Sequence, residues 1–386
     1  MTASTPIGSG PPAGRAAAVP TGPAAIRPVV TGVGVLSAAG RGLTALTEAT
    51  AHGKAAFAEV TRFDVTARRT TRAALLPAGV PLASTFPLAR AVLDAIGQAC
   101  RQAGLTAAEG AGMPVLLALH SDERTRATAE AVAAGVRQGW GAPGVTRVYT
   151  SACVAAATAV ADAAVLVATG RHERVLVAAG HLVEPGVFAV FDAGRALARD
   201  GELRPFSTGR TGTLLADATA AVVVEAAPDA ERRGAPALAR LAGWGRTGDA
   251  HHVCRPEPEG TGVTRAIEAA LTRAGVTPAE VGYVNANGTG STLSDQAEAT
   301  ALRRVFGPHT DQLPVSSSKS VHGHALEATG LLELAVTIGA LNDGLLPVNA
   351  GWLGPDPAVG LDLVLDGPRA AHPRYALTLN SAFGGA

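Results

Sequence analysis

The sequence predicts an α/β protein in which helices cover both faces of a buried parallel or mixed sheet. Short β-branched segments alternate with longer Ala-rich segments along the chain, as expected for strands buried under helices. Apolar residues make up 47% of the 386 residues and charged residues only 17%, which allows a large core. Aromatic residues contribute 4%, so Ala, Val and Leu must fill this core.

The first half begins with a predicted strand at residues 28–36, where a β-branched run ends in small residues. A helix is expected at 43–52. The later strands of this half are expected at 113–119, 147–150, 174–179 and 219–226, with Ala-rich helices between them. Residues 1–27 are rich in Pro, Gly, Ala, Ser and Thr, and they predict a flexible leader.

A charged, Pro-containing connection at 228–236 is the expected boundary between two halves, residues 28–227 and 237–386. The second half repeats the alternation of strands and helices. Helices are expected at 262–274, 294–306 and 324–341, and strands at 281–285 and 313–316.

The overall charge and the cysteine content exclude several classes of function. Lys and Arg balance Asp and Glu at 32 each, so no global field attracts nucleic acid or an anionic membrane. The three cysteines, Cys100, Cys153 and Cys254, are widely spaced and form neither a disulfide framework nor a metal cage. No membrane span or secretion signal is recognisable, which favours the cytoplasm. We expect no metal and no cofactor.

Cys153 is the first candidate for chemistry. A predicted strand leads into Thr150-Ser151-Ala152-Cys153, and an Ala-rich helix follows, so the thiol lies near a helix N-terminus. Free backbone N–H groups there favour a thiolate, and we expect its pKa to fall. Taken alone, this context is equally compatible with a buried, inert cysteine.

Two polar segments of the second half are further candidates. Asn287-Gly288-Thr289-Gly290 follows a predicted strand, and its glycines would let the backbone approach a ligand, although an Asn-Gly turn also explains it. The stretch from Lys319 to Gly330 places His324 at the expected start of a helix, where the dipole would keep the imidazole neutral. A polar loop with a capping His is the alternative.

Together these segments resemble the ketosynthases of fatty-acid and polyketide synthesis, members of the thiolase superfamily. The Cys153 segment is similar to their T-A-C elbow, 287–290 to their H-G-T-G loop, and 319–330 to their K-S-x-x-G-H-x-x-x-A-x-G loop. Further matches in the same order are Val30–Gly34, Arg62–Asp64, Arg204–Phe206 and Asn380–Gly385.

The resemblance implies a thiolase-like fold, in which two similar halves form a five-layered αβαβα sandwich. It implies that Cys153 takes an acyl group from the phosphopantetheine thioester of an acyl carrier protein. It also implies a homodimer, or a heterodimer with a related ketosynthase-like subunit. The catalytic residues would be Cys153, Asn287 and His324, with supporting or oxyanion roles for Lys319, Glu333, Phe383 and Gly384.

The sequence departs from the family at Asn287, where the first catalytic His of the ketosynthases is expected. An Asn side chain can donate a hydrogen bond to a developing enolate but cannot take up a proton. Three functions therefore remain open. They are a condensing ketosynthase, an acyltransferase that passes the Cys153-bound acyl group to an O, N or S nucleophile or another carrier without condensation, and a non-catalytic partner subunit resembling chain-length factors.

An acidic carrier protein would need a basic patch on this neutral chain. Arg62, Arg68, Arg69 and Arg72 cluster in the sequence, and the resemblance places Arg204 near the entrance. These five arginines are the predicted carrier-binding residues. A solvated loop is the alternative explanation of this cluster.

Overall fold

The computed structural model describes residues 26–77 and 85–385. Its largest element is a mixed sheet whose strands lie between residues 28 and 240. Its strands follow the order β2-β1-β8-β7-β5-β6, and β9 pairs with β1. Their bounds are β1 Pro28–Ser37, β2 Gly40–Arg41, β5 Val115–Ala118, β6 Val145–Tyr149, β7 Arg174–His181, β8 Ala218–Ala226 and β9 Ala239–Arg240. β5, β6 and β7 are parallel, whereas β8 is antiparallel to both β7 and β1.

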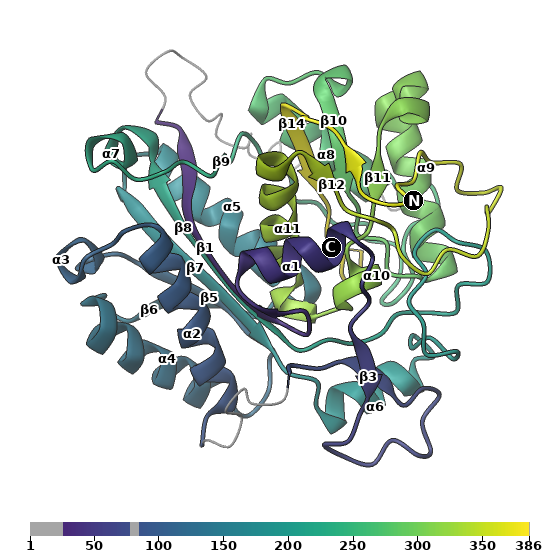
Figure 1. Ribbon diagram of the computed structural model, residues 1–386, viewed down its shortest axis with the longest axis horizontal. Helices are drawn as coiled ribbons and strands as arrows, with labels where there is room; N and C mark the ends of the chain where they lie inside the picture. The colour runs from purple at the N-terminus through teal and green to yellow at the C-terminus, as the bar shows by residue number, and fades with distance from the viewer. Residues whose placement is uncertain (1–25, 78–84, 386) are drawn as a thin grey trace, which may run out of the picture.

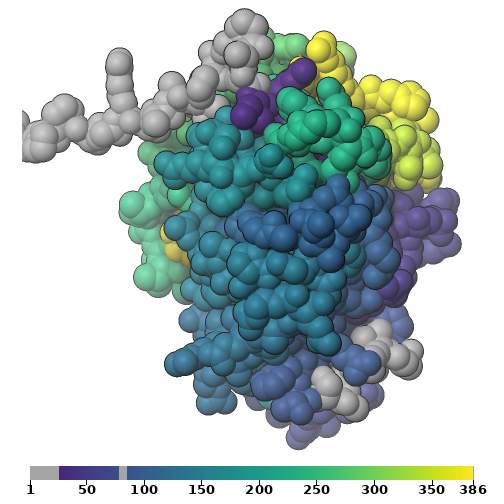
Figure 2. Space-filling view, turned by 90° about the vertical axis from the view of Figure 1, so that its left-hand side faces the viewer, coloured from purple at the N-terminus to yellow at the C-terminus, as the bar shows by residue number. Residues whose placement is uncertain are grey.

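Two groups of helices cover the two faces of this sheet (Figure 1). α2 (Pro87–Gln102), α3 (Ala107–Gly110) and α4 (Thr125–Trp140) form the outer layer. Figure 2 shows this outer face, which is covered by the N-terminal half in blue and teal. α1 (Leu43–Ala51), α5 (Ala155–Ala168) and α11 (Thr329–Asp343) lie on the other face, between the large sheet and a second sheet.

The second sheet has the order β11-β10-β14, and its three strands are parallel. They are β10 (Val281–Asn285), β11 (Val315–Ser316) and β14 (Tyr375–Thr378). α8 (Thr261–Ala274) and α9 (Thr292–Phe306) cover its outer side (Figure 1). The layers thus alternate helix, sheet, helix, sheet, helix, which confirms the predicted five-layered sandwich.

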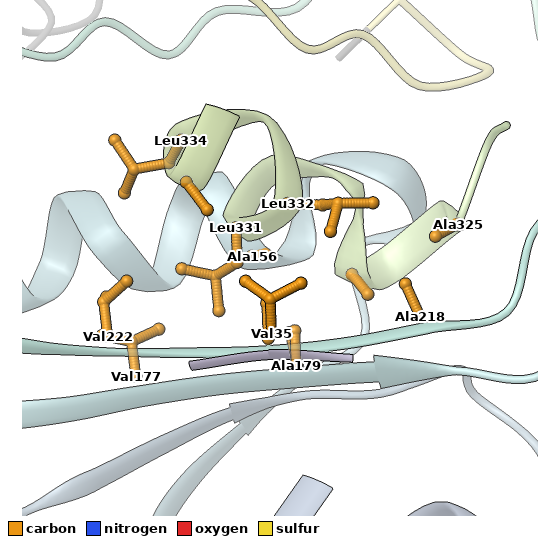
Figure 3. Close-up of a cluster of buried hydrophobic side chains, with 14 of the residues drawn as sticks. Val35, Ala156, Val177, Ala179, Ala218, Val222, Ala325, Leu331, Leu332 and Leu334 are labelled. Carbon is orange, nitrogen blue, oxygen red and sulfur yellow. The ribbon is translucent and has the colours of Figure 1, made fainter. Parts of the chain in front are cut away.

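The middle helices are held by aliphatic packing. Leu331, Leu332 and Leu334 of α11 and Ala156 of α5 meet Val35 and other valines and alanines of the large sheet (Figure 3). Gly330 makes this close approach possible, because a Cβ there would lie 2.8 Å from the backbone nitrogen of Ala157. Burying such side chains contributes about 25 cal/mol per Å² of apolar surface. This packing fixes the N-terminal ends of α5 and α11, where the candidate site lies.

Short elements complete the chain. Two antiparallel strand pairs lie outside the two sheets: β3 (Phe57–Glu59) with β4 (Arg72–Ala74), and β12 (Leu345–Leu346) with β13 (Arg369–Ala370). The described ranges 26–77 and 85–385 also contain the short helices α6 (Pro185–Ala193), α7 (Ala227–Arg232) and α10 (Lys319–His322). The 3₁₀ turns are η1 (Ala152–Val154), η2 (Pro278–Glu280), η3 (Gly307–Gln312) and η4 (Leu326–Ala328). No helix in these ranges has the length and apolar character needed to cross a membrane.

The predicted helix at 324–341 is wrong at its start. Gly323 has φ +74° and Leu326 has φ +41°, so the chain cannot remain α-helical between α10 and α11. His324 instead forms an isolated parallel bridge with Leu215, and η4 separates it from α11. The imidazole is therefore positioned by strand-like pairing with the first half, not by the first turn of a helix.

Candidate active site

Cys153 lies in a tight turn between β6 and α5. The turn is strained, because Ala152 has φ +49°, a left-handed conformation that alanine rarely adopts. It places Cys153 in η1, directly before the first turn of α5, and leaves the residue 7% exposed. This geometry agrees with the predicted strand-to-helix elbow.

The thiol of Cys153 and the imidazole of His324 face each other. Nε2 of His324 lies 3.2 Å from Sγ of Cys153, and its Nδ1 lies 3.0 Å from the hydroxyl of Thr329. The backbone N–H of His324 donates to the carbonyl of Leu214 at 2.7 Å. Both ring nitrogens therefore have a partner, and the backbone hydrogen bond fixes the residue that carries the ring.

Burial keeps both partners uncharged in the resting protein. It lowers the pKa of His324 well below its ordinary value, and the nearby ammonium of Lys319 lowers it further. Burial also raises the pKa of the Cys153 thiol to about 12, with a smaller contribution from the Glu327 carboxylate. The predicted fall in the Cys153 pKa is therefore not found, because desolvation of the thiolate outweighs the favourable helix end.

Asn287 follows β10 and presents its side-chain amide in a defined orientation. Its Oδ1 accepts hydrogen bonds from Nζ of Lys319 at 3.1 Å and from the backbone N–H of Ser381 at 3.2 Å. Both partners are donors, so the oxygen must lie on their side and the Nδ2 group on the other. Asn287 lines the same cavity as Cys153 and His324, so its NH₂ is a donor available to a ligand there.

A buried ion pair supports this amide. Nζ of Lys319 lies 2.5 Å from Oε1 of Glu333 and also donates to the backbone carbonyl of Asn287 at 2.6 Å. Nδ2 of Asn380 donates to the other oxygen of Glu333. Burial raises the pKa of Glu333 to about 7 in spite of Lys319, which shows how strongly this carboxylate depends on its partners. The structure thus brings the predicted supporting residue Lys319 into direct contact with Asn287 and places Glu333 behind it as the partner of Lys319.

The glycines of the 287–290 loop are required by the fold, and their approach to a ligand stays a prediction. Gly288 has φ +27°, and a Cβ there would lie 2.6 Å from the side chain of Ser317. Glu298 of α9 accepts the backbone N–H groups of Asn287 and Gly288 at 2.7 and 2.8 Å. The expected close approach is therefore to neighbouring protein atoms.

The predicted oxyanion residues of the C-terminal segment lie at the surface. Phe383 is 53% exposed, lines the cavity that contains Cys153, and packs its ring 5.5 Å from that of Phe191. Gly384, with φ +89°, is not among the cavity-lining residues. Phe383 is thus placed near the site, while the role of Gly384 stays a prediction.

The cavity has a volume of about 900 Å³ and begins at Cys153, Asn287 and His324. It extends over α5 and α8 and along β14 and residues 239–247. Its size is within the range of small-molecule sites and is large enough for an acyl thioester.

The predicted carrier-binding arginines are mostly paired within the chain. Arg62 contacts Asp217 at 2.8 Å, and Arg72 contacts Glu202 at 2.5 Å. Arg68 lies 3.7 Å from Asp192, whose carboxylate accepts the backbone N–H of Arg69, and Arg204 pairs with Asp200 at 2.8 Å. These ion pairs leave little unneutralised positive charge on the predicted patch.

Six other arginines lie at the cavity and were missed by sequence reasoning. They are exposed, line the cavity and have no ion pair with the described part of the chain: Arg195, Arg199, Arg240, Arg246, Arg255 and Arg374. They lie far apart in the sequence, so no local pattern identifies them. The Ser381 backbone was missed for the same reason, since only the fold brings it to Asn287. Thr329 is close to His324 in the sequence, but its contact with Nδ1 depends on the η4 turn between them.

Two family models match most of the chain. The N-terminal domain of β-ketoacyl synthases matches residues 82–230, and the C-terminal domain matches residues 238–352. Nodulation protein E of Rhizobium meliloti is 38% identical over 263 residues, which are 67% of this chain and 64% of that protein. The 3-oxoacyl-[acyl-carrier-protein] synthase 2 of Staphylococcus aureus is 33% identical over 250 residues, 64% of this chain and 62% of that protein. The alignments thus span less than two thirds of these relatives.

Solved structures with the same architecture cover nearly the whole chain. The ishigamide ketosynthase/chain length factor is 27% identical, with a TM-score of 0.85 over 94% of this chain and 97% of that one. A β-ketoacyl synthase from Burkholderia phymatum is also 27% identical, with a TM-score of 0.83 over 93% and 97%. A ketosynthase bound to its type II PKS acyl-carrier protein shares the fold, at 24% identity and a TM-score of 0.86 over 94% and 97%. The fold is thus that of the thiolase-like ketosynthases.

Proposed function

Because the chain belongs to the β-ketoacyl synthase family, we propose that it takes an acyl group from acyl carrier protein onto Cys153 and condenses it with a malonyl-type extender. The orientation of the Asn287 amide carries this proposal. Lys319 and Ser381 hold Oδ1 and leave the NH₂ as a donor in the cavity shared with Cys153 and His324. A donor fixed in advance is what a developing enolate oxygen requires.

In the proposed loading step, Sγ of Cys153 attacks the carbonyl carbon of the carrier thioester as its proton passes to Nε2 of His324. The distance of 3.2 Å allows this transfer. Collapse of the tetrahedral intermediate breaks the bond to the carrier sulfur, which leaves as a thiol with the proton from His324. The acyl group is then bound to Cys153.

In the proposed condensation step, the malonyl thioester loses carbon dioxide and its electron pair forms an enolate. Between the two steps neutral His324 exchanges a proton with solvent and becomes the Nε2–H tautomer, in which Nδ1 accepts from the Thr329 hydroxyl. The NH₂ of Asn287 and Nε2–H of His324 would then donate to the enolate oxygen. The enolate carbon then attacks the acyl carbonyl on Cys153, and the bond to Sγ breaks to release the β-ketoacyl carrier. Sγ leaves as a thiolate, and a proton from solvent restores the thiol. Preorganised donors of this kind contribute several kcal/mol to such steps.

A second candidate, acyl transfer without condensation, is favoured by one observation. His324 is the only imidazole among the residues lining the cavity in the described chain, and Asn287 cannot exchange a proton. His324 would then act as the base for an O, N or S nucleophile. A third candidate, a non-catalytic partner subunit, fits poorly with the close pairing of Cys153 and His324.

For partners, we propose an acyl carrier protein and a second subunit, identical or related. The support is the ketosynthase solved with its carrier protein and the ketosynthase/chain length factor pair among the similar structures.

One experiment separates the three functions. The purified protein is incubated with acyl carrier protein thioester, acyl mass on Cys153 is measured, and malonyl carrier is then added. Loading followed by carbon dioxide release supports condensation, loading without release supports transfer, and no loading contradicts both.

A further inference from the structure

The second sheet has an open edge that lines the 900 Å³ cavity. In the described part of the chain β14 pairs only with β10, so one side of this strand has no partner. Residues 242–247 line the same cavity, and within 26–77 and 85–385 none of their backbone groups bonds to another backbone group. An unpaired sheet edge is a template for a further strand. The part of the cavity bounded by β14 and residues 241–247 is called the slot.

The first half of the chain shows which element belongs at such a place. The parallel strands β11-β10-β14 repeat the arrangement β6-β5-β7 of the large sheet. Residues 239–247 precede the first helix of the second half, as β1 precedes α1. In the large sheet β8 lies between β7 and β1 and is antiparallel to both. Among the described residues β8 has no counterpart in the second half, and the slot lies where this counterpart would be.

Residues 241–247 are positioned like a strand of the second sheet. A Cβ at Gly243 would lie 2.1 Å from the carbonyl oxygen of Ala270, and a Cβ at Gly245 would lie 1.8 Å from that of Ala266. Two alternate residues of the segment thus pack directly on α8, which is the period of a β-strand. α5 and α11 line the opposite side of the cavity with mostly aliphatic side chains (Figure 1). An extended segment in the slot would therefore be covered by helices on both faces.

The open side of β14 offers backbone donors. The N–H of Leu379, just after β14, donates to the carbonyl of Asn285 in β10 at 3.0 Å. Backbone N–H groups alternate between the two sides of a strand, so those of Ala376 and Thr378 point away from β10 and into the slot. Backbone groups without a partner cost free energy when they leave water, and a strand in the slot would pair them.

One end of the slot carries two arginines that have no ion pair in the described chain. Arg240 immediately precedes residues 241–247, and Arg374 immediately precedes β14. Both are exposed and line the cavity. At the corresponding place in the large sheet, Glu225 of β8 pairs with Arg174, the first residue of β7. The slot therefore suits an antiparallel strand with a carboxylate near its C-terminal end.

We propose that the slot binds a partner polypeptide as an added β-strand between β14 and residues 241–247. The partner segment runs antiparallel to β14 and has small or β-branched apolar side chains that fit between the helices. Near its C-terminal end it carries an acidic residue for Arg240 and Arg374. Residues 1–25 of this chain are a poor alternative, because they contain five prolines, which lack the donor that a ladder requires. Binding of the strand involves no step of the proposed acyl chemistry.

The peptide of β8 is the probe, because this strand fills the corresponding place in the large sheet. A nine-residue peptide with the sequence of residues 218–226 is titrated into the 386-residue protein, and amide hydrogen exchange is followed by mass spectrometry. We expect exchange in residues 242–247 and 375–378 to slow at least about tenfold at saturation, because paired amides exchange only after opening. The same peptide with Val222→Pro, which interrupts the ladder, should give no protection. No protection by the β8 peptide, or equal protection by its proline variant, would overturn the proposal.

A charge exchange tests the direction of the added strand. In Arg374→Glu the β8 peptide should bind about tenfold more weakly, and a peptide with Glu225→Lys should recover most of this affinity. Arg90→Glu, an exposed position on the outer helix α2, is the matched control and should bind the β8 peptide like the wild type. Fluorescence anisotropy of labelled peptides measures the affinities. Unchanged affinity in Arg374→Glu would show that the antiparallel placement is wrong. Protection of the slot amides that rises with protein concentration in the absence of peptide would assign the slot to a second copy and overturn the proposed partner.

Discussion

Nε2 of His324 lies 3.2 Å from Sγ of Cys153, and this pair unites two residues that are 171 positions apart in the chain. The other two cysteines have different environments. Cys100 is fully buried in the core between α2 and the large sheet, and Cys254 is exposed at the edge of the 900 Å³ cavity. Only Cys153 combines a turn before a helix with a neighbouring base.

We therefore expect Cys153→Ala to abolish covalent acyl loading. Cys100→Ala and Cys254→Ala should retain it, because neither thiol has an imidazole partner in the described chain. Intact-protein mass spectrometry after incubation with acyl carrier thioester measures the loading. Acyl mass on Cys153→Ala, mapped to Cys254, would show that the nucleophile is assigned to the wrong thiol.

The pKa of the Cys153 thiol, raised to about 12 by burial, predicts a simple pH dependence. Because the thiolate forms only as pH approaches this value, alkylation by iodoacetamide should accelerate about tenfold per pH unit between roughly pH 6 and 9. The rate is measured on Cys254→Ala, so that only the site thiol reacts at the surface. A plateau near neutral pH would instead indicate a thiolate–imidazolium pair.

Lys319 and Glu333 should each be tolerated in the core only when the other is present. Lys319→Met leaves a buried, uncompensated carboxylate and should lower the free energy of unfolding by about 3–5 kcal/mol. Lys319→Met with Glu333→Leu should recover part of this loss. Urea denaturation measures both, and Arg126→Met, which breaks the exposed Arg126–Glu130 pair, is a control expected to change little.

The single variant should also have a stronger pH dependence than the wild type. The pKa of Glu333 is raised to about 7 in the folded protein even with Lys319 present, against an ordinary value of 4.5, and without Lys319 it should rise further. The folded state binds a proton that the unfolded state releases, so wild-type stability should fall as pH rises from about 4.5 through 7, and stability of the variant should continue to fall above pH 7. A pH-independent free energy of unfolding in Lys319→Met would contradict the assigned burial of this charge.

Binding of acyl carrier protein should distinguish the arginines predicted from the sequence, which are mostly ion-paired, from the cavity arginines, which are not. Charge reversal at Arg199 and Arg246, which have no ion pair in the described chain, should weaken binding of acyl carrier protein at least about tenfold and reduce its salt dependence. Reversal at Arg62 and Arg68 should have a smaller effect, because Asp217 and Asp192 already pair with these two guanidinium groups. Binding is measured by titration at two salt concentrations. The reverse order of effects would return the carrier site to the predicted 62–72 patch.

The sequence predicts best what local patterns determine. The strand at Val281–Asn285 was predicted with its bounds, because a short apolar run there lies between turn signals. The start of the helix after His324 was missed, since tertiary pairing with Leu215 holds the histidine outside it. The neutralised Arg62 was missed too, because its partner Asp217 is 155 positions away.

The candidate site shows the same difference between features set by local sequence patterns and features set by tertiary contacts. Cys153, Asn287, His324 and Lys319 were found from ordered motifs, and the fold brings them together. The orientation of the Asn287 amide could not be predicted, because it depends on the Ser381 backbone 94 positions away. The raised pKa of Cys153 was missed because the helix end is a local signal, whereas burial depends on the whole fold.

The amide of Asn287 provides the sharpest test of the proposed condensation. Asn287→Asp keeps an oxygen for Lys319 and Ser381 but replaces the NH₂ donor with a second acceptor oxygen. We expect malonyl decarboxylation to fall by about 10²–10³, the usual effect of removing one oxyanion donor, while acyl loading on Cys153 persists. Carbon dioxide release and acyl mass are measured on the same samples. An unchanged rate of release in Asn287→Asp would show that this amide does not contact the enolate.

Asn287→His then separates condensation from simple acyl transfer. An imidazole restores a second ring donor that can also exchange a proton, but it loses the Oδ1 acceptor that binds Lys319 and Ser381. If the site is built for condensation, carbon dioxide release should rise, because the new imidazole donates at the enolate oxygen. If the site is adapted to transfer, release should stay flat and transfer of the loaded acyl group should slow. In either background His324→Ala should severely reduce the step after loading, since His324 is the only imidazole lining the cavity in the described chain. A fully active His324→Ala enzyme would contradict the site as a whole.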